Sequence, residues 1–239
     1  MMKKIQKMQK MKNMSKSALI ILSGGLDSTV SLAYLQKEMP IKLAITFDYG
    51  QRAARNEISA SKKIADFYNI EHKVIELPWL KEITKTALVN TKNEIPEPDI
   101  TKDTTEAMKA VWVPNRNGSF LNIAASFCDS LNIDYIIFGA NKEESSTFPD
   151  NSQEFIDNIN KSLEFSTLTK TKVIGPLIDF DKTQIVKLGA DLNIPFHLIM
   201  SCYNETEKHC GKCESCKRFK NALEKAGLNE ISEKVFDAK

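Results

Sequence analysis

The sequence predicts an α/β fold, with a doubly wound parallel sheet covered by helices and a small C-terminal helical segment that binds zinc. Three observations predict this. Short apolar, β-branched runs alternate along the chain with longer segments whose apolar residues recur at helical spacing. A glycine-rich turn at residues 23–28 follows the first apolar run, and four cysteines cluster at residues 202–216. Alternation of strands and helices is typical of parallel sheets, which bind ligands at the carboxyl ends of their strands.

The elements follow one another in a regular order. Five apolar runs bounded by turn residues predict strands, at residues 18–22, 43–47, 73–77, 135–138 and 171–174. Four periodic segments predict helices, at residues 28–38, 53–69, 118–131 and 182–189. Two helix starts have the pattern of a capping box, Asp181 with Gln184 and Asn151 with Glu154. Residues 78–114 are less regular, and we interpret them as an excursion in the form of a lid.

Charge is distributed unevenly along the chain. All six lysines of residues 1–16 lie in a stretch without acids, so the whole chain has a net charge of +2 while the remaining residues hold 27 basic and 31 acidic groups, a net charge of −4. An acidic body argues against a dedicated nucleic-acid-binding protein. Residues 1–16 lack the apolar stretch of a secretory signal, so we interpret them as a disordered basic tail or a miscalled start.

No segment has the length of a membrane span. The longest stretch without Asp, Glu, Lys or Arg runs from residue 192 to 204, whereas a transmembrane helix needs about 18 apolar residues. We therefore expect a soluble, cytoplasmic protein with no membrane partner.

The loop after the first strand, Ser23-Gly24-Gly25-Leu26-Asp27-Ser28, has the composition of a phosphate-binding turn. Its glycines let backbone N–H groups approach an anion, its serines add hydroxyl donors, and the following helix contributes the positive end of its dipole. No G-x-x-x-x-G-K-[ST] string occurs in the chain, which argues against transfer of a γ-phosphate by a Walker-type site.

At these residues the sequence resembles the PP-loop ATP pyrophosphatases, which split ATP between the α and β phosphates. The resemblance implies a Rossmann-like fold similar to the adenine-nucleotide hydrolases, with ATP and Mg²⁺ as cofactors. It implies that Asp27 braces the loop or positions Mg²⁺. Lys182 matches a lysine that these enzymes use on the phosphates, although a lysine in the first turn of a helix is more often simply solvated. The residues implied to hold the nucleotide in the loop are Leu22, Ser23, Gly24, Gly25, Leu26, Asp27, Ser28 and Thr29.

Four further strings are similar to one branch of that superfamily, the 7-cyano-7-deazaguanine synthases. They are FDYGQR at residues 47–52, VPNRN at 113–117, GAN at 139–141, and the cysteine cluster with Ser201-Cys202-Tyr203. The resemblance implies an ATP-dependent ligase that converts 7-carboxy-7-deazaguanine and ammonium to the nitrile, in queuosine or archaeosine precursor biosynthesis. The carboxylate and then the amide would be activated by adenylation. It also favours a homodimer that acts on small molecules and not on nucleic acid.

Within this reading, Asp27, Lys182 and Arg116 are the expected catalytic residues. Asp48, Gln51 and Gly139 are expected near the nucleotide. The residues expected to bind the deazaguanine acid are Arg116, Asn117, Asn141, Phe148 and Asp150. Asn117 is equally well explained as the N-cap of a helix that begins at residue 118, and Phe47 and Tyr49 are more simply explained as packing residues.

One segment departs from the branch. Where many members have Asp-x-Ser-Gly-Tyr-Pro-Asp-Cys-Arg, this chain has ESSTFPDNS at residues 144–152, which keeps Ser146, Pro149 and Asp150. The departure fits either the same substrate or another deazapurine. We hypothesise that Asp150 accepts the N–H donors of the guanine-like edge, because a buried carboxylate left unpaired discriminates strongly against other ligands.

Two other functions remain open at this point. A tRNA-modifying enzyme of the thiolation type can carry the same loop, but such enzymes commonly need redox-active cysteines and a basic surface. A nucleotide sensor without catalytic activity would also keep the loop.

The cysteine cluster has the spacing of a metal site. Cys202, Cys210, Cys213 and Cys216 supply four soft ligands, enough to close a tetrahedral and therefore structural zinc site. An iron–sulfur cluster, or His209 in place of one cysteine, are the alternatives; His209 is otherwise expected at the surface, as are His72 and His197. Cys128 lies on an apolar helical face and is expected in the core. The chain thus divides into a tail at residues 1–16, a nucleotide-binding domain at 17–200 and a zinc-binding segment at 201–239.

Overall fold

The computed structural model describes residues 16–102 and 104–236, and a sheet of five parallel strands lies at its centre. The spatial order is β3-β2-β1-β4-β5. Each strand predicted from the sequence is present, with ends that differ by at most two residues. The strands are β1 Ala18–Ile21, β2 Ile41–Asp48, β3 Glu71–Glu76, β4 Tyr135–Ile137 and β5 Lys172–Ile174.

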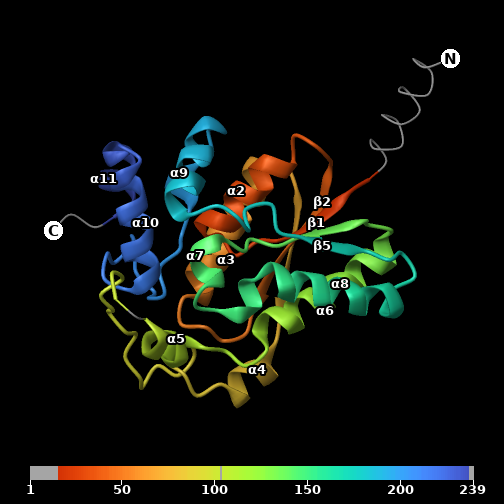
Figure 1. Cartoon of the computed structure of the whole chain (residues 1–239), viewed down its shortest axis with the longest axis horizontal. Helices are drawn as coiled ribbons and strands as arrows, with labels where there is room; N and C mark the ends of the chain where they lie inside the picture. Colours follow the sequence, from red (N-terminus) through yellow and green to blue (C-terminus); the bar gives the residue numbers. More distant parts are fainter. Residues whose placement is uncertain (1–15, 103, 237–239) are drawn as a thin grey trace.

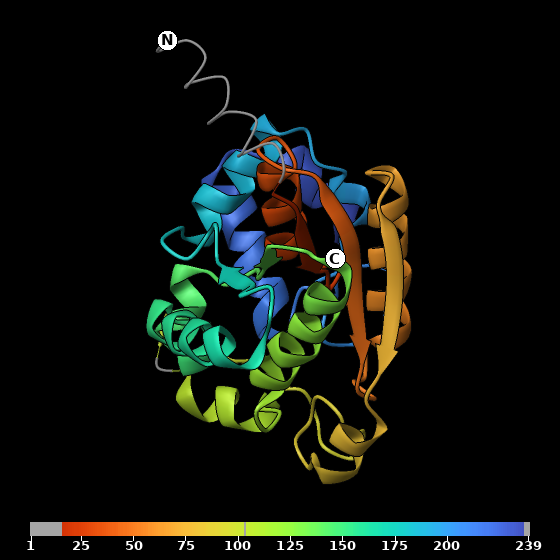
Figure 2. The same ribbon diagram turned by 90° about the vertical axis from the view of Figure 1, so that its right-hand side faces the viewer.

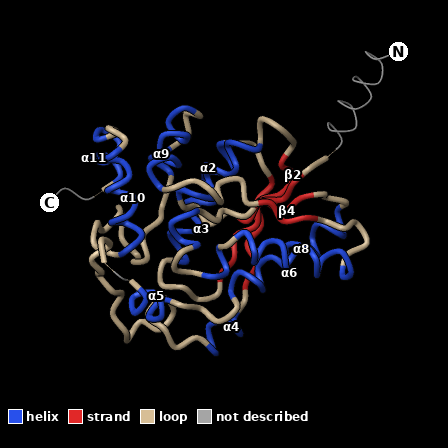
Figure 3. The backbone as a smooth tube through the Cα atoms, in the orientation of Figure 1, coloured by secondary structure: helices blue, strands red, loops and turns tan. Residues whose placement is uncertain are grey.

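Helices cover both faces of this sheet (Figures 1 and 3). Helices α2 (Leu26–Leu35) and α3 (Ala54–Phe67) lie on one face, and α6 (Arg116–Leu131) and α8 (Gln153–Ser166) on the other. Connections from β1 through β3 run toward one edge, and those to β4 and β5 run toward the opposite edge, so right-handed crossovers place the two helix pairs on opposite faces. The reversal occurs between β1 and β4, where a crevice forms at the carboxyl ends of the strands.

The central strand shows why the sheet must be sandwiched. In β1 and the residue after it, Leu19 and Ile21 belong to one apolar cluster while Ala18, Ile20 and Leu22 belong to the other. All five side chains are buried. A strand that is apolar on both sides needs helices on both sides, which is the pattern that the continuous apolar run predicts.

The C-terminal helices lie beside α2 at one end of the molecule (Figure 1). Helix α9 (Lys182–Asp191) packs against α2, and α10 (Glu214–Lys225) packs against both α9 and α11 (Asn229–Val235). Phe219 and Leu223 of α10 are buried in the same apolar cluster as Leu19 of β1. The segment after residue 200 is therefore fixed to the central sheet by shared core packing.

The excursion at residues 78–114 is also packed. It carries α4 (Pro78–Ile83) and α5 (Thr105–Val111), and Figure 2 shows its first half beyond the carboxyl ends of β2 and β3. Leu80, Leu88 and Val111 are buried. The side chain of Lys217 on α10 donates to the carbonyls of Glu97 and Pro98 at 3.0 and 2.8 Å, which ties the middle of the excursion to the C-terminal segment.

One of the two predicted capping boxes forms. Asp181 accepts from the amide of Gln184 at 2.7 Å, and the Gln184 side chain accepts from the Asp181 amide at 2.9 Å. The prediction for Asn151 is wrong. Asn151 ends a 3₁₀ turn, η1 (Pro149–Asn151), and Ser152, whose backbone is extended, caps α8 by accepting from the amide of Phe155 at 3.1 Å.

The remaining elements are two short ones, α7 (Lys142–Ser145) after β4 and η2 (Phe196–Leu198) after α9. Of the predicted basic tail, residues 1–15 lie outside the described residues, and Lys16 donates to the hydroxyl of Tyr135 at 2.7 Å. Within residues 16–102 and 104–236, no helix has the length and apolar character needed to cross a membrane.

Candidate active site

A cavity of about 210 Å³ opens at the point where the strand order reverses. Its walls come from the carboxyl ends of β1, β2 and β4, from the start of α6, and from the loop that precedes the cysteine cluster. The lining residues from these parts include Leu22, Ser23, Gly25, Asp27, Ser28, Phe47, Tyr49, Arg116, Asn117, Gly139, Ser201 and Tyr203. Segments far apart in sequence thus meet where the parallel sheet predicts a ligand.

Two glycines determine the shape of the loop after β1 and of its surroundings. Gly24 has a φ of +75°, and a Cβ on it would lie 2.8 Å from the Cβ of Ala60 and 2.9 Å from the carbonyl of Glu57. Gly139 brings the end of β4 against the start of α2, since a Cβ there would lie 3.0 Å from the Ser28 amide. Close backbone approach is what an anion cradle requires.

Hydroxyl groups order the same loop. Ser23 and Ser28 share a hydrogen bond of 3.1 Å between their hydroxyls, and the Thr29 hydroxyl donates to the carbonyl of Gly25 at 2.7 Å. The amide of Leu26, the first in α2, donates to the hydroxyl of Ser201 at 3.1 Å. The N-terminal end of α2 therefore faces the cavity in a fixed position.

Lys182 reaches the loop from α9. Its Nζ lies 2.6 Å from Oδ2 of Asp27 and 2.8 Å from Oε1 of Glu144. Burial lowers the pKa of this lysine, but the two carboxylates outweigh burial and hold its pKa above the usual value. Burial raises the pKa of Asp27 although Lys182 opposes it, whereas the pKa of Glu144 is lowered because Lys182 and further donors outweigh burial. The second oxygen of Asp27, Oδ1, is buried with no hydrogen-bond partner in the described structure.

The opposite end of the cavity is built from side chains. Arg116 is partly buried, and its guanidinium donates to the hydroxyl of Tyr49 at 3.3 Å and to Oδ1 of Asn117 at 3.2 Å. Burial raises the pKa of Tyr49 to about 12 although Arg116 opposes it, so this hydroxyl stays neutral. The Asn117 side chain also donates to the Asp150 carbonyl at 3.4 Å.

A second, smaller cavity of about 50 Å³ continues from this end, and both cavities are lined by Arg116, Glu144 and Tyr203. Trp112 and Phe148 line it with rings nearly parallel, at an angle of 9° and a centroid separation of 6.3 Å. Asp150 lies at its wall; burial raises the pKa of its carboxyl although Arg116 opposes this. An aromatic, partly polar recess next to a phosphate loop suits a planar heterocycle.

Three residues that the sequence predicts in the site, Asp48, Gln51 and Asn141, do not line either cavity but support the residues that do. Asp48 accepts from the Gly50 amide at 2.9 Å and lines neither cavity. Gln51 is buried, accepts from the Tyr49 amide at 3.0 Å and donates to Glu57 at 2.9 Å. Asn141 is the N-cap of α7, and its Nδ2 is buried without a hydrogen-bond partner among the described residues.

The N-cap reading of Asn117 is wrong, because α6 begins at Arg116 and its N-cap is Asn115, which has a φ of 48°. Phe47 and Tyr49 are buried as the sequence predicts, and Phe47 stacks on Phe120 at 4.0 Å between ring centroids, but both also line the cavity.

Sequence reasoning did not assign several of the lining residues to the site, among them Glu57, Glu144, Ser201 and Tyr203. The last two flank Cys202, so their position beside the cluster was the available signal. Glu57 lies in the first turn of α3, where nothing in the sequence distinguishes it from a solvated glutamate.

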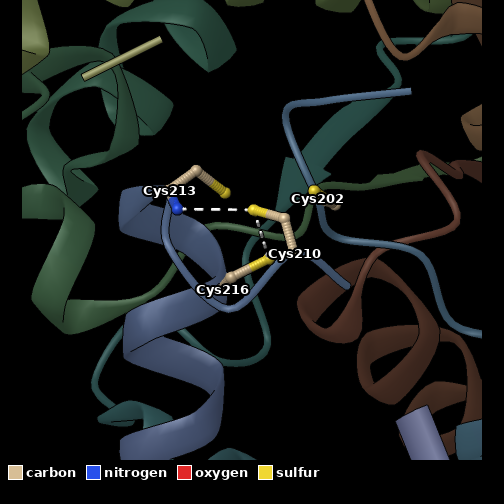
Figure 4. Close-up of side chains that lie close together, drawn as sticks. All are labelled: Cys202, Cys210, Cys213 and Cys216. Carbon is tan, nitrogen blue, oxygen red and sulfur yellow. Dashed lines mark hydrogen bonds between the residues drawn. The ribbon is translucent and has the colours of Figure 1, made fainter. Parts of the chain in front are cut away.

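The four clustered cysteines converge (Figure 4). Their sulfur atoms all lie within 4.8 Å of one another, close to the spacing of about 3.8 Å expected around a tetrahedral zinc with Zn–S bonds of about 2.3 Å. Gly211 has a φ of +71°, which permits the turn after Cys210. The amides of Lys212 and Cys213 donate to the Cys210 sulfur at 3.4 and 3.5 Å.

The prediction that His209 is a surface residue is wrong. It is only 1% exposed and packs between Phe219 and Phe236. Its Nε2 accepts from the amide of Ser201 at 2.9 Å, which leaves the proton on Nδ1, 3.1 Å from the carbonyl of Val235. Both ring nitrogens are thus occupied. His72 is half-buried and its Nε2 lies 2.7 Å from the Thr46 hydroxyl, whereas His197 is exposed and Cys128 is buried as expected.

Known proteins and a family model match this sequence over most of its length. A family model described as queuosine biosynthesis protein QueC matches residues 17–227. A protein of Carboxydothermus hydrogenoformans named 7-cyano-7-deazaguanine synthase is 50% identical over 208 residues, covering 86% of this chain and 97% of the relative. A protein of the same name from Pelotomaculum thermopropionicum is 49% identical over 216 residues, covering 88% and 98%. Among solved structures, a predicted tRNA methyltransferase subunit from Methanocaldococcus jannaschii matches with a TM-score of 0.49 and 20% identity, covering 89% of this chain and 88% of that one.

Proposed function

The chain belongs to the QueC family of queuosine biosynthesis proteins, and we propose how its cavity carries out ATP-dependent synthesis of 7-cyano-7-deazaguanine. The observation that carries the proposal is Lys182, buried between Asp27 and Glu144 where a glycine-built phosphate loop meets an aromatic recess. The substrates are 7-carboxy-7-deazaguanine, ammonia and two molecules of ATP.

The reaction needs two activations. The carboxylate attacks the α-phosphorus of ATP and expels pyrophosphate; ammonia then displaces AMP to give the amide. The amide oxygen attacks a second ATP, and loss of AMP and a proton from the resulting imidate leaves the nitrile. Adenylation converts oxygen into a leaving group in both halves, so the enzyme's work is positioning and charge stabilisation.

We assign the phosphates to the loop after β1. The N-terminal amides of α2 and the serine hydroxyls face the cavity there, and an anion is stabilised by both. Lys182 stays protonated because its pKa is raised, so it can balance negative charge at the α-phosphorus as pyrophosphate leaves. Gly139 keeps the end of β4 close enough to close the cradle from the other side.

The residues around Lys182 also fit Mg²⁺. The connected network holds four carboxylates and only two cations, Lys182 and Arg218, so its carboxylates exceed its cations by two charges when all are ionised. Asp27 Oδ1 is a buried acceptor with no partner among the described residues. We propose that Asp27, with Glu144, holds the ion, which supplies charge neutralisation on the phosphates.

We assign the deazaguanine acid to the recess lined by Trp112 and Phe148. Arg116 offers a rigid two-pronged donor for a carboxylate or phosphate between the two arms of the cavity. Asp150 lies where it could accept N–H donors from the ring edge, and Asn117 fixes the Asp150 backbone. Asn141 acts through α7, which it caps.

No covalent enzyme intermediate is required. Cys128 is buried and burial raises the pKa of its thiol to about 12, so it is a poor nucleophile. The other four cysteines form the cluster. This leaves no cysteine for the redox chemistry that the rival tRNA-thiolation reading needs.

We propose that the four cysteines bind one structural zinc ion, which supplies folding free energy to the C-terminal segment. Chelation should release one zinc per chain and make residues 201–236 the first site of proteolysis. Unchanged cleavage after complete metal removal would contradict the proposal.

We further propose that the enzyme works in the cytoplasm as a homodimer on small molecules, without nucleic acid. The net acidic charge of residues 17–239 supports the last point.

The decisive assay combines the purified chain with ATP, ammonium and 7-carboxy-7-deazaguanine, followed by mass spectrometry. The nitrile with two AMP per molecule is expected. Turnover only in the presence of tRNA would favour a tRNA-modifying enzyme, and no AMP at all would favour a nucleotide sensor.

A further inference from the structure

Lys182 is held at both ends by two consecutive acids of α7. Glu144 Oε1 accepts from its side-chain Nζ at 2.8 Å, and Glu143 Oε1 accepts from its backbone amide at 3.0 Å. The backbone bond matters because Lys182 is the first residue of α9, and the first amides of a helix have no partner within it. Asp181 caps the amide of Gln184 and leaves that of Lys182 to Glu143. Glu143 thereby fixes where α9 begins relative to the phosphate loop.

Glu143 is in turn held from the C-terminal segment. Its second oxygen, Oε2, accepts from Nη1 of Arg218 at 3.2 Å. Nε and Nη2 of the same guanidinium donate to Oε1 of Glu214 at 3.1 and 2.8 Å. The side chains of Arg218 and Glu214 are 15% and 5% exposed, so both are held in place by packing.

These contacts start directly at the cysteine cluster. Glu214 follows Cys213 as the first residue of α10, and Cys216 lies within the same turn. A second link leads from the cluster to the phosphate loop, because His209, next to Cys210, accepts from the amide of Ser201, whose hydroxyl accepts from the amide of Leu26. Two separate chains of hydrogen bonds therefore lead from residues next to the clustered cysteines to the site assigned to the phosphates, one to Lys182 and one to Leu26.

We infer that Arg218 is a positioning residue for Lys182, because it holds Glu143, which fixes the start of α9. The cysteine cluster, which adjoins Arg218, therefore helps to align the lysine assigned to the phosphates in addition to stabilising the fold. Arg218 lines neither cavity, and its guanidinium is paired with Glu143 and Glu214. The inference rests on the proposed function in one respect, the role of Lys182 toward ATP. A rigid fork that holds two carboxylates at once is a task to which arginine is suited and lysine is not.

The test compares Arg218→Gln, Arg218→Lys and Glu143→Gln with a matched control, Lys225→Gln, which removes a positive charge from the exposed last turn of the same helix. With Arg218→Gln we expect kcat for nitrile formation to fall about 10- to 100-fold, because a displacement of about 1 Å at a catalytic group has this effect. The Michaelis constant for the deazaguanine acid and the zinc content per chain should stay as in the unmodified enzyme. Arg218→Lys should recover only part of kcat, and Lys225→Gln should have no effect.

The double variant separates positioning from a general effect on the cluster. Glu143→Gln keeps an oxygen for the Lys182 amide but loses the ion pair with Arg218. If Arg218 acts through Glu143, adding Arg218→Gln to Glu143→Gln lowers kcat by less than about twofold. If Arg218 only stabilises the cluster, its full effect persists in that background, and the inference is wrong.

Two further outcomes are decisive. A wild-type kcat in Arg218→Gln or in Glu143→Gln overturns the inference. Should Arg218→Gln lose its metal, Glu143→Gln decides the matter, because Glu143 lies outside the cysteine segment. Failure of the proposed function has a different signature, since then the unmodified chain itself forms no nitrile.

Discussion

The cavity has two ends that are built in different ways: the end at the loop after β1, assigned to the phosphates and called the phosphate end, and the recess lined by Trp112 and Phe148, assigned to the acid and called the substrate end. At the phosphate end, backbone geometry does the work: Gly24 and Gly139 allow chain segments to approach within 3 Å of a would-be Cβ, and helix α2 points its amides inward. At the substrate end, side chains from α6, from η1 and from the loops before α6 and η1 supply the surface, with Arg116, Asp150 and two aromatic rings. The first end tolerates almost no change in shape, whereas the second can be altered one side chain at a time.

This difference in construction means that binding of ATP and selection of the acid substrate depend on different parts of the cavity. The segment at residues 144–152, which departs from the pattern of many relatives, contributes Phe148 and Asp150 to the substrate end, and only its first residue, Glu144, pairs with Lys182 at the phosphate end. We therefore expect substitutions at the phosphate end to reduce turnover with every substrate, and those at the other end to change Michaelis constants selectively.

The largest effect is expected from Asp27→Asn. It removes the negative charge of one of the two carboxylates on Lys182 and so weakens the ligand assigned to Mg²⁺; kcat for AMP release should fall by about 10²- to 10³-fold. Asp191→Asn, at the exposed end of α9, is the control and should leave kcat unchanged. Retained AMP release in Asp27→Asn would remove the phosphate end from the mechanism.

Arg116→Lys tests the junction of the two ends. Lysine keeps the charge but cannot contact Tyr49 and Asn117 in a fixed fork, so kcat/KM should fall by about 10- to 100-fold. A loss confined to the Michaelis constant for the acid would place Arg116 wholly at the substrate end. A loss confined to that for ATP would place it at the phosphate end.

A smaller, pH-dependent effect is expected from Asp150. The ionised carboxylate is the form that accepts N–H donors, and burial raises its pKa, so binding of the acid should weaken as the pH falls through that raised pKa and be strongest above it. The Michaelis constant for the acid should thus rise toward low pH, and Asp150→Asn should raise it throughout and abolish this rise. Parallel pH profiles for the two proteins would contradict the assignment.

The smallest effect is expected outside both ends. Cys128→Ala removes a fully buried sulfur whose thiol donates to the carbonyl of Tyr135 at 3.8 Å. Thermal unfolding should show a loss of about 1 kcal/mol, with kcat and zinc content unchanged. A change in zinc content would bring Cys128 into the metal site.

Prediction from the sequence succeeded where local chemistry determines local structure. Apolar runs predicted all five strands, and the Asp181–Gln184 pair predicted a cap, because both depend on neighbours in the chain. Asn151 failed because the preceding Pro149 starts a 3₁₀ turn that moves the cap to Ser152. Asn151 and Ser152 are both residue types that cap helices, and the position of the turn determines that Ser152 is the cap.

The site residues likewise fall into those that a local sequence pattern predicts and those that only tertiary contacts bring together. The residues of the glycine loop could be named because their pattern is contiguous. The ion pair of Lys182 with Glu144, the burial of His209 and the position of Glu57 depend on tertiary contacts, since Lys182 meets Asp27 across 155 positions and Glu144 across 38. No local pattern contains that information.

The bond between Leu26 and Ser201 joins residues 175 positions apart, and this has a consequence for protein synthesis. A ribosome makes the phosphate loop early and its partners late: β4, Lys182 and the serine all emerge afterwards, in that order. A nascent chain therefore carries the nucleotide loop for most of translation without the groups that complete it.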